Sequence, residues 1–127
     1  MILFNKERGQ ELPIPEGKTI GFVDSEDQLN AITRALNDAG YPDSKIAALH
    51  GPEGVEMLER LRDVAFFGDF ERAVADKGVH ELQKGHYSLA VTVGDRDEGV
   101  RVADIAEPFG GHSFTYFGKW VNEQLTK

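Results

Sequence analysis

Cysteine is missing from this sequence, and its absence removes several kinds of chemistry at once. Disulfide bonds, thiolate metal ligands and cysteine nucleophiles all require a thiol. The chain also lacks any apolar run near the roughly 20 residues that span a bilayer. Its first apolar residues give way to the charged Lys6, Glu7 and Arg8, which is not the pattern of a secretory signal. We therefore expect no membrane partner and a cytoplasmic location.

Basic residues are in deficit. The chain has 14 lysines and arginines against 22 aspartates and glutamates, which gives a formal net charge of −8 at pH 7. The basic residues are scattered along the chain and form no cluster. Because an acidic surface repels phosphate backbones, we expect no nucleic-acid partner.

The composition otherwise fits one folded domain. The chain has 127 residues, of which 40% are hydrophobic, and this is enough for a single core without disulfides. Residues 1–17 are polar and contain Pro13 and Pro15. We predict an N-terminal arm over residues 1–17 and one domain over residues 18–127.

Two segments of the chain, residues 19–50 and 89–120, look like copies of one unit offset by 70 positions. Val23 of the first copy corresponds to Val93 of the second. The pattern of each copy predicts a strand, a helix and a second strand. The four predicted strands are residues 19–23, 46–49, 87–93 and 112–117.

Capping residues mark the ends of the two predicted helices. Ser25 is followed by Gln28, and Asp95 by Glu98, which is the capping-box spacing at a helix start. Gly40 stands where the first helix needs a left-handed residue at its end. Both copies therefore have the same capping pattern at the start of their predicted helix.

Residues 51–86, between the two units, form a predicted helical insert. Apolar side chains recur there at helical spacing on both sides of Gly68, and Asp69 suits the cap of the second stretch. Gly78 lies inside that stretch and weakens a helix by roughly 1 kcal/mol relative to alanine. The pattern allows a kink there, or two shorter helices.

This element order predicts an α+β fold. Two strand-helix-strand units related by a pseudo-twofold form the ferredoxin-like arrangement, in which the helices pack on one face of a four-stranded antiparallel sheet. The first and third strands are expected in the centre. A doubly wound parallel sheet is the alternative, because strands and helices alternate.

Apolar residues lie on both faces of the predicted sheet, and their burial contributes roughly 25 cal/mol per Å². Either the inserted helices or a second copy of the chain must cover the second face. The aromatic last strand, with Phe114, Tyr116 and Phe117, also favours edge pairing. We therefore expect a homodimer.

No catalytic and no metal-binding residues are predicted. His112 and Ser113 are neighbours on a predicted strand and should point to opposite faces, so they do not form a nucleophile–base pair. No two histidines have the i, i+4 spacing that joins metal ligands on a helix. The turn at residues 50–54 lies where phosphate loops often occur, but Glu53 and Glu56 already occupy the helix start.

One small-molecule site is compatible with the pattern. His50 ends the second strand and His86 begins the third, and these ends meet if the two strands are antiparallel neighbours. Phe67 belongs to the aromatic cluster of the insert, and Tyr116 lies on the last strand. These four are the candidate ligand-binding residues, and we expect no cofactor.

The duplicated unit and the ending at residues 110–120 resemble small bacterial proteins that are similar to the general-stress-protein group of ferredoxin-like domains. In that group a strand such as residues 20–24 leads into a helical segment such as residues 26–41. The resemblance covers about residues 19–125. It implies a stress-associated cytoplasmic role through contact with another protein, and it carries no reaction and no catalytic residues.

Two hypotheses of function follow. The first is a non-enzymatic, stress-associated module that self-associates or binds a protein partner. The alternative is a small-molecule binding protein or enzyme of the dimeric ferredoxin-like barrel type, with its site between the sheet and the inserted helices. The missing catalytic parts favour the first, whereas a cavity with polar groups would favour the second.

Overall fold

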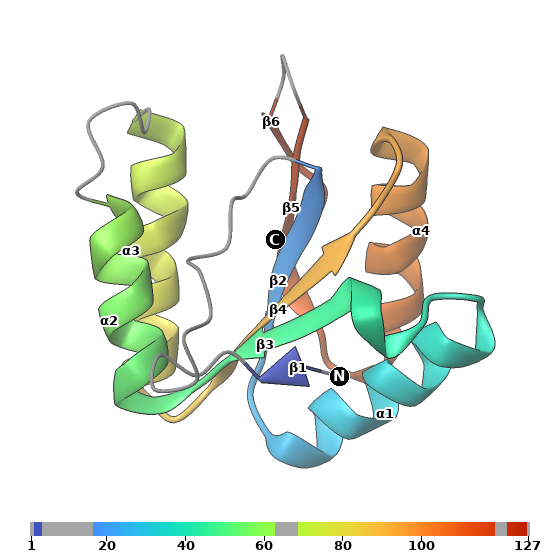
Figure 1. The fold of residues 1–127 in the computed structure, drawn as a ribbon, viewed down its shortest axis with the longest axis horizontal. Coiled ribbons are helices and arrows are strands. Elements are labelled where there is room, and N and C mark those ends of the chain that lie inside the picture. The colour runs from blue at the N-terminus through green and yellow to red at the C-terminus, as the bar shows by residue number, and fades with distance from the viewer. Residues whose placement is uncertain (1, 4–16, 63–68, 119–121, 127) are drawn as a thin grey trace.

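A computed structural model describes residues 2–3, 17–62, 69–118 and 122–126 of the chain (Figure 1). The strands are β1 (Ile2–Leu3), β2 (Lys18–Val23), β3 (Ile46–Leu49), β4 (Tyr87–Thr92), β5 (His112–Phe117) and β6 (Asn122–Gln124). The α-helices are α1 (Glu26–Asp38), α2 (Gly51–Arg62), α3 (Asp69–Gln83) and α4 (Arg96–Ala106). Short 3₁₀ turns precede β3 at Asp43–Lys45 and follow α4 at Glu107–Phe109.

The strands form one sheet in the order β1-β3-β4-β2-β5-β6. All neighbours from β3 to β6 pair antiparallel, and β1 pairs parallel with β3. The α+β class is confirmed, β2 and β4 occupy the centre as expected, and the doubly wound parallel alternative is wrong. The expected four-stranded sheet is also wrong, because the described residues form a sheet of six strands.

The two additional strands cover backbone groups that β3 and β5 would otherwise leave unpaired at the sheet edges. Ile2 and Leu3 pair with Ala47 and Ala48, so this part of the predicted arm belongs to the sheet. β6 is a short, polar strand whose sequence has no alternation that would indicate it. An ion pair between Arg96 of α4 and Glu123 also holds β6 against the domain.

The two copies of the strand-helix-strand unit begin their helices in the same way. The Ser25 hydroxyl accepts a hydrogen bond from the Gln28 backbone N–H, and 70 residues later the Asp95 carboxylate accepts one from Glu98. In both units the side chain at the third helical position accepts in turn from the backbone N–H before the cap. The two predicted caps are therefore confirmed, whereas the return bond of each predicted capping box goes to the residue before the cap and not to the cap itself.

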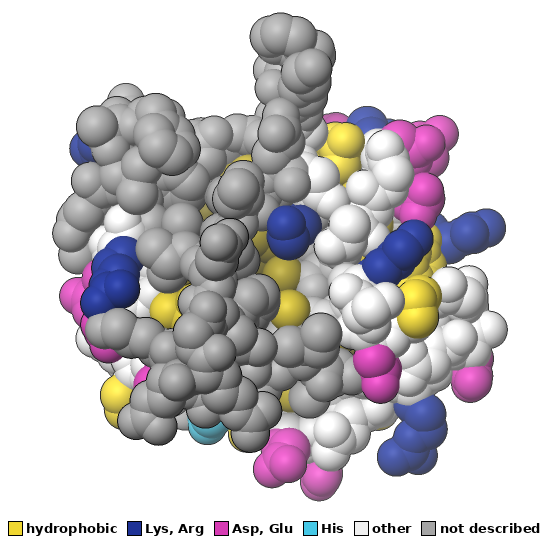
Figure 2. Space-filling view, viewed as in Figure 1, with side chains coloured by type: hydrophobic (Ala, Val, Ile, Leu, Met, Phe, Trp, Pro, Cys, Tyr) yellow, Lys and Arg dark blue, Asp and Glu magenta, His cyan; other side chains and the backbone are white. Residues whose placement is uncertain are grey.

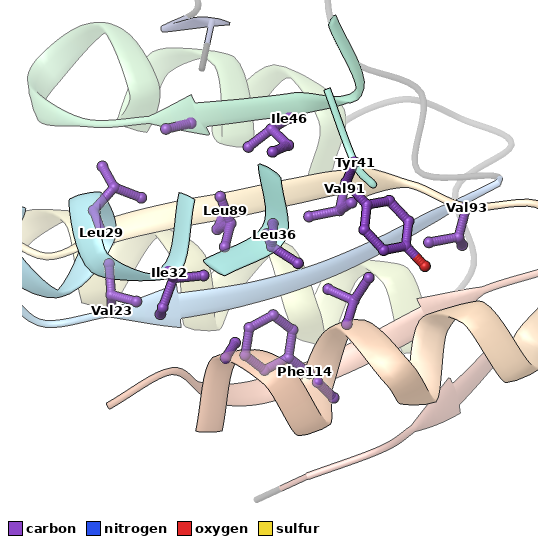
Figure 3. Close-up of a cluster of buried hydrophobic side chains, with 14 residues drawn as sticks. Val23, Leu29, Ile32, Leu36, Tyr41, Ile46, Leu89, Val91, Val93 and Phe114 are labelled. Carbon is purple, nitrogen blue, oxygen red and sulfur yellow. The ribbon is translucent and has the colours of Figure 1, made fainter. Parts of the chain in front are cut away.

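The main core lies between one face of the sheet and the helices α1 and α4 (Figures 1 and 3). β4 contributes Leu89 and Val91, and β5 contributes Phe114, whose side chain has no exposed surface. Two leucines and an isoleucine on the buried side of α1 pack into this core. These three helical residues are Leu29, Ile32 and Leu36.

The inserted helices α2 and α3 lie on the other side of the sheet (Figure 1). They form a second apolar cluster with Leu49 of β3, and Phe22 on this face of β2 is 1% exposed. α3 continues without a break through Gly78. A Cβ at Gly78 would lie 2.8 Å from Leu58 Cδ1 of α2 and 3.4 Å from the Phe22 ring. The glycine therefore allows the two helices and the sheet to approach closely.

One hydroxyl in the main core lacks a partner. Thr19 Oγ1 of β2 is buried under α4 and has no hydrogen bond among the described residues. An unsatisfied buried hydroxyl costs about 1–3 kcal/mol, and valine has nearly the same shape. We expect Thr19→Val to raise the free energy of unfolding by about 1 kcal/mol or more in urea titrations.

Thr92→Val, at an exposed site of β4, serves as the control for Thr19→Val. It should change the free energy of unfolding by under about 0.5 kcal/mol. A less stable Thr19→Val protein would show that the hydroxyl is bonded in solution.

Charged side chains of both signs are interspersed on the surface over α1 and α4 in Figure 2. This mixture is typical of a solvated helix face. No helix among the described residues is both long and apolar enough to cross a membrane.

Candidate functional site

Two histidines and two carboxylates meet where β2 ends and β4 and β5 begin. Asp24 follows β2, Glu81 lies on α3, His86 precedes β4 and His112 begins β5. His86 Nδ1 lies 2.6 Å from Glu81 Oε2 and 3.3 Å from Asp24 Oδ1. His112 Nε2 lies 2.8 Å from Asp24 Oδ1. We call these four residues the His–carboxylate cluster.

The end of α3 positions two members of the cluster. Gly85 adopts a left-handed conformation with φ 88°. The His86 backbone N–H donates to the Glu81 carbonyl, and the Gly85 N–H donates to the Leu82 carbonyl. This is a Schellman motif, and it turns the chain so that His86 lies over the last turn of the helix. Glu81 and His86 are therefore joined twice, by this backbone hydrogen bond and by the contact between their side chains.

Exposure decreases across the cluster from Asp24 to Glu81. The Asp24 side chain is 53% exposed, the histidines are partly buried, and the Glu81 side chain is 10% exposed. The hydrogen bond from His112 lowers the pKa of Asp24. Nearby positive charge acts in the same direction, whereas partial burial opposes it. Asp24 is therefore an ionised carboxylate at neutral pH, open to solvent on one side.

The predicted separation of His112 and Ser113 is wrong. Ser113 has φ 58°, and the pairing of β5 with β2 shifts register at this point. The left-handed residue interrupts the alternation of the strand, so His112 Nδ1 lies 3.2 Å from Ser113 Oγ. Because a carboxylate only accepts, the His112 Nε2–H donates to Asp24. In the neutral ring the Ser113 hydroxyl then donates to Nδ1.

The order hydroxyl, imidazole, carboxylate is the one that activates a serine nucleophile. Acyl transfer also needs N–H groups that stabilise an oxyanion. Two N–H groups near Ser113 are already engaged: the Phe114 N–H donates to Thr126 Oγ1, and the Gly111 N–H, two residues before Ser113, donates to the Ala106 carbonyl. We therefore assign no catalytic role to Ser113.

A crevice lies next to the cluster, between α3 and the strands β5 and β6. Its volume is about 240 Å³. Ser113 belongs both to the crevice wall and to the hydrogen bonds of His112, so the two features share a boundary. The described residues that line the crevice are Ala73, Val74, Lys77, Ser113, Thr115 and Gln124.

The structure brings together only some of the predicted ligand-binding residues. His50 and His86 are neighbours, since His50 Nδ1 lies 3.4 Å from the His86 carbonyl oxygen. The His50 ring stacks on Tyr87 at 3.9 Å between centroids. Tyr116 packs on the main core near Gly99 of α4, which is the opposite face of the sheet from α3. Phe67 lies outside the described residues.

Sequence reasoning missed Asp24, Glu81 and His112 as neighbours, yet one signal was present. The first and last strands of the duplicated units pair antiparallel, with Phe22 opposite His112. The end of one strand therefore meets the start of the other. The same reasoning that placed His50 near His86 would have placed Asp24 near His112.

A scan against protein-family models finds no match, and searches of curated proteins and of solved structures also find none. The resemblance to the general-stress-protein group therefore stays a prediction from the sequence.

Proposed function

We propose that this protein binds a small, polar, anionic molecule in the crevice between α3, β5 and β6. The single observation that carries this proposal is the crevice itself, because it lies between the sheet and an inserted helix and has polar groups on both walls. Its volume of about 240 Å³ is below the range of about 300–1,000 Å³ that holds drug-sized ligands. The ligand is therefore expected to be compact.

The side chains that line the crevice are suited to a ligand that carries a carboxylate group. Lys77 of α3 supplies a positive charge, while Ser113, Thr115 and Gln124 supply hydroxyl and amide groups. Ala73 and Val74 add an apolar wall for a short carbon chain. A charge-assisted hydrogen bond from an ammonium to a carboxylate is stronger than a neutral one, so Lys77 is expected to contribute the most to affinity.

The test is a titration of ¹⁵N-labelled protein with short mono- and dicarboxylic acids, followed by amide chemical shifts. The expected result is a set of saturable shifts that centre on the crevice walls. Lys77→Met should weaken binding of the acid that binds best by about 10-fold or more, because it removes the charge-assisted bond. Thr115→Leu, which fills the space, should abolish it.

Lys45→Met is the matched control, because Lys45 is an exposed lysine distant in sequence from α3 and both strands. It should leave the dissociation constant unchanged within twofold. Shifts that are scattered over the surface, or equal losses in Lys77→Met and Lys45→Met, would contradict a site in the crevice.

The fold type and the other hypotheses from the sequence remain proposals. We infer a ferredoxin-like core, supported by the order β3-β4-β2-β5 with antiparallel neighbours and by the repeated caps. Self-association, a protein partner, a cytoplasmic location and a stress-associated role stay predictions. α2 and α3 bury apolar residues on the second sheet face, so these helices supply a cover that a second copy of the chain was expected to provide as one of two possibilities.

A further inference from the structure

The His–carboxylate cluster contains the side-chain types that bind divalent transition metals. Asp24, Glu81 and His112 can each offer one ligand atom, and these three atoms lie within 4.8 Å of one another. Imidazole nitrogen and carboxylate oxygen together are suited to zinc and its first-row neighbours, whereas magnesium and calcium prefer oxygen alone.

The spacing of the cluster is close to that of a coordination sphere. Zinc lies about 2.0–2.2 Å from nitrogen and oxygen ligands, so two ligand atoms of a tetrahedral site are about 3.3–3.6 Å apart. Asp24 Oδ1 is 2.8 Å from His112 Nε2 and 3.3 Å from His86 Nδ1. The first contact is a hydrogen bond between His112 and Asp24, and the second is a close approach of His86 to the same carboxylate oxygen. Glu81 lies farther from His112, with its Oε1 3.9 Å from Nδ1. A metal ion could replace the His112 Nε2 proton beside Asp24, and the Glu81 side chain would rotate toward it to complete the set of three ligands.

Charge and access also favour a cation. Asp24 and Glu81 are two carboxylates in one cluster, and the chain as a whole carries a formal net charge of −8. Glu81 is nine-tenths buried and contacts His86 Nδ1, and the Asp24 carboxylate lies 3.3 Å from the same ring nitrogen, so two carboxylates share one imidazole nitrogen. Asp24 is more than half exposed and provides the entry from solvent.

We propose that Asp24, Glu81 and His112 bind one divalent transition-metal ion, with Zn²⁺ as the reference ion. His86 acts as a positioning residue, because its Nδ1–H donates to Glu81 Oε2 at 2.6 Å and orients that carboxylate. Three protein ligands leave a further coordination position for water or a small ligand. This inference does not depend on the crevice ligand, and the crevice variant Lys77→Met should bind zinc like the wild type.

The test is isothermal titration of untagged, EDTA-treated and dialysed full-length protein with ZnCl₂. The expected result is one equivalent of Zn²⁺ per chain. Glu81→Gln and His112→Gln should each weaken binding by at least about 100-fold, and His86→Gln by about 10–100-fold, because it removes an orienting contact rather than a ligand. X-ray absorption should show nitrogen and oxygen ligands around the bound zinc.

His80→Gln is the matched control, because His80 is an exposed histidine on the same helix, one residue before Glu81. It should leave zinc affinity unchanged within twofold. Circular dichroism of each variant without metal shows whether it is folded. Should Glu81→Gln fail to fold, Asp24→Asn at the exposed ligand tests the same prediction. Absence of one-equivalent binding in the wild type, or a loss in His80→Gln equal to that in the ligand variants, would overturn the proposal.

Discussion

Replacing Phe114 with alanine is expected to lower the free energy of unfolding by about 3–5 kcal/mol. The phenylalanine side chain is fully buried in the main core, between the sheet and α4 (Figure 3). Removing the ring leaves a cavity in addition to the lost burial of apolar surface. Because a domain of this size has about 5–15 kcal/mol of stability in total, the variant should unfold at far lower urea concentration.

The matched control is Phe109→Ala, since Phe109 is 44% exposed and is the exposed large hydrophobic residue of the described chain. The same change of side chain there should cost under about 0.5 kcal/mol. Equal effects of the two substitutions in urea titrations would show that Phe114 does not anchor the core.

Gly21→Ala is expected to destabilise the protein by about 1–3 kcal/mol, although alanine itself suits a strand better than glycine. A Cβ at Gly21 would lie 2.4 Å from Cδ1 and Cε1 of Phe114, and 2.6 Å from its Cγ. The ring has little room to move away, because Phe114 has no exposed surface and packs within the main core, and its other edge lies close to Gly111. Urea unfolding monitored by circular dichroism measures the change.

A double-mutant cycle between Gly21 and Phe114 isolates this contact. In the Phe114→Ala background the ring is gone, so Gly21→Ala should cost nothing or stabilise the protein slightly. The sum of the two single-mutant destabilisations should therefore exceed the destabilisation of the double mutant by about 1–3 kcal/mol. Additive effects would mean that the cost of Gly21→Ala comes from the backbone rather than from the ring.

Elements that depend on near neighbours in the chain could be predicted well. The helix caps at Ser25 and Asp95 formed as expected, and Gly40 is left-handed with φ 101°. The Tyr41 backbone N–H donates to the Leu36 carbonyl, which closes the end of α1. These interactions span three to five residues, so the sequence contains both partners within one turn.

The sequence predicted a helix that begins after Asp69 and contains Gly78, but it left a kink or a break at that glycine open, because the reason for the continuity of α3 lies outside the helix. Propensity favours a break at a glycine by roughly 1 kcal/mol. The packing of Leu58 and Phe22 against this position outweighs that cost, since no larger residue fits without a shift. Contacts with α2 and β2 therefore outweigh the low helix propensity of Gly78.

The candidate site depended even more on distant partners. Asp24 and His112 are 88 residues apart, and they meet because β2 and β5 are paired. Ser113 turns toward His112 only through its left-handed backbone and the register shift beside it. Strand alternation predicted the opposite orientation, because a regular strand was assumed.

By itself the sequence determined the element order, the helix caps, the α+β class and the absence of thiol chemistry, because each is set by residue type or by contacts within a few positions. Only the tertiary structure decided that the sheet has six strands, that α2 and α3 cover its second face, and that four titratable side chains meet at one end. Strand register and helix docking set these distances, and both arise from packing between segments that the chain order leaves far apart.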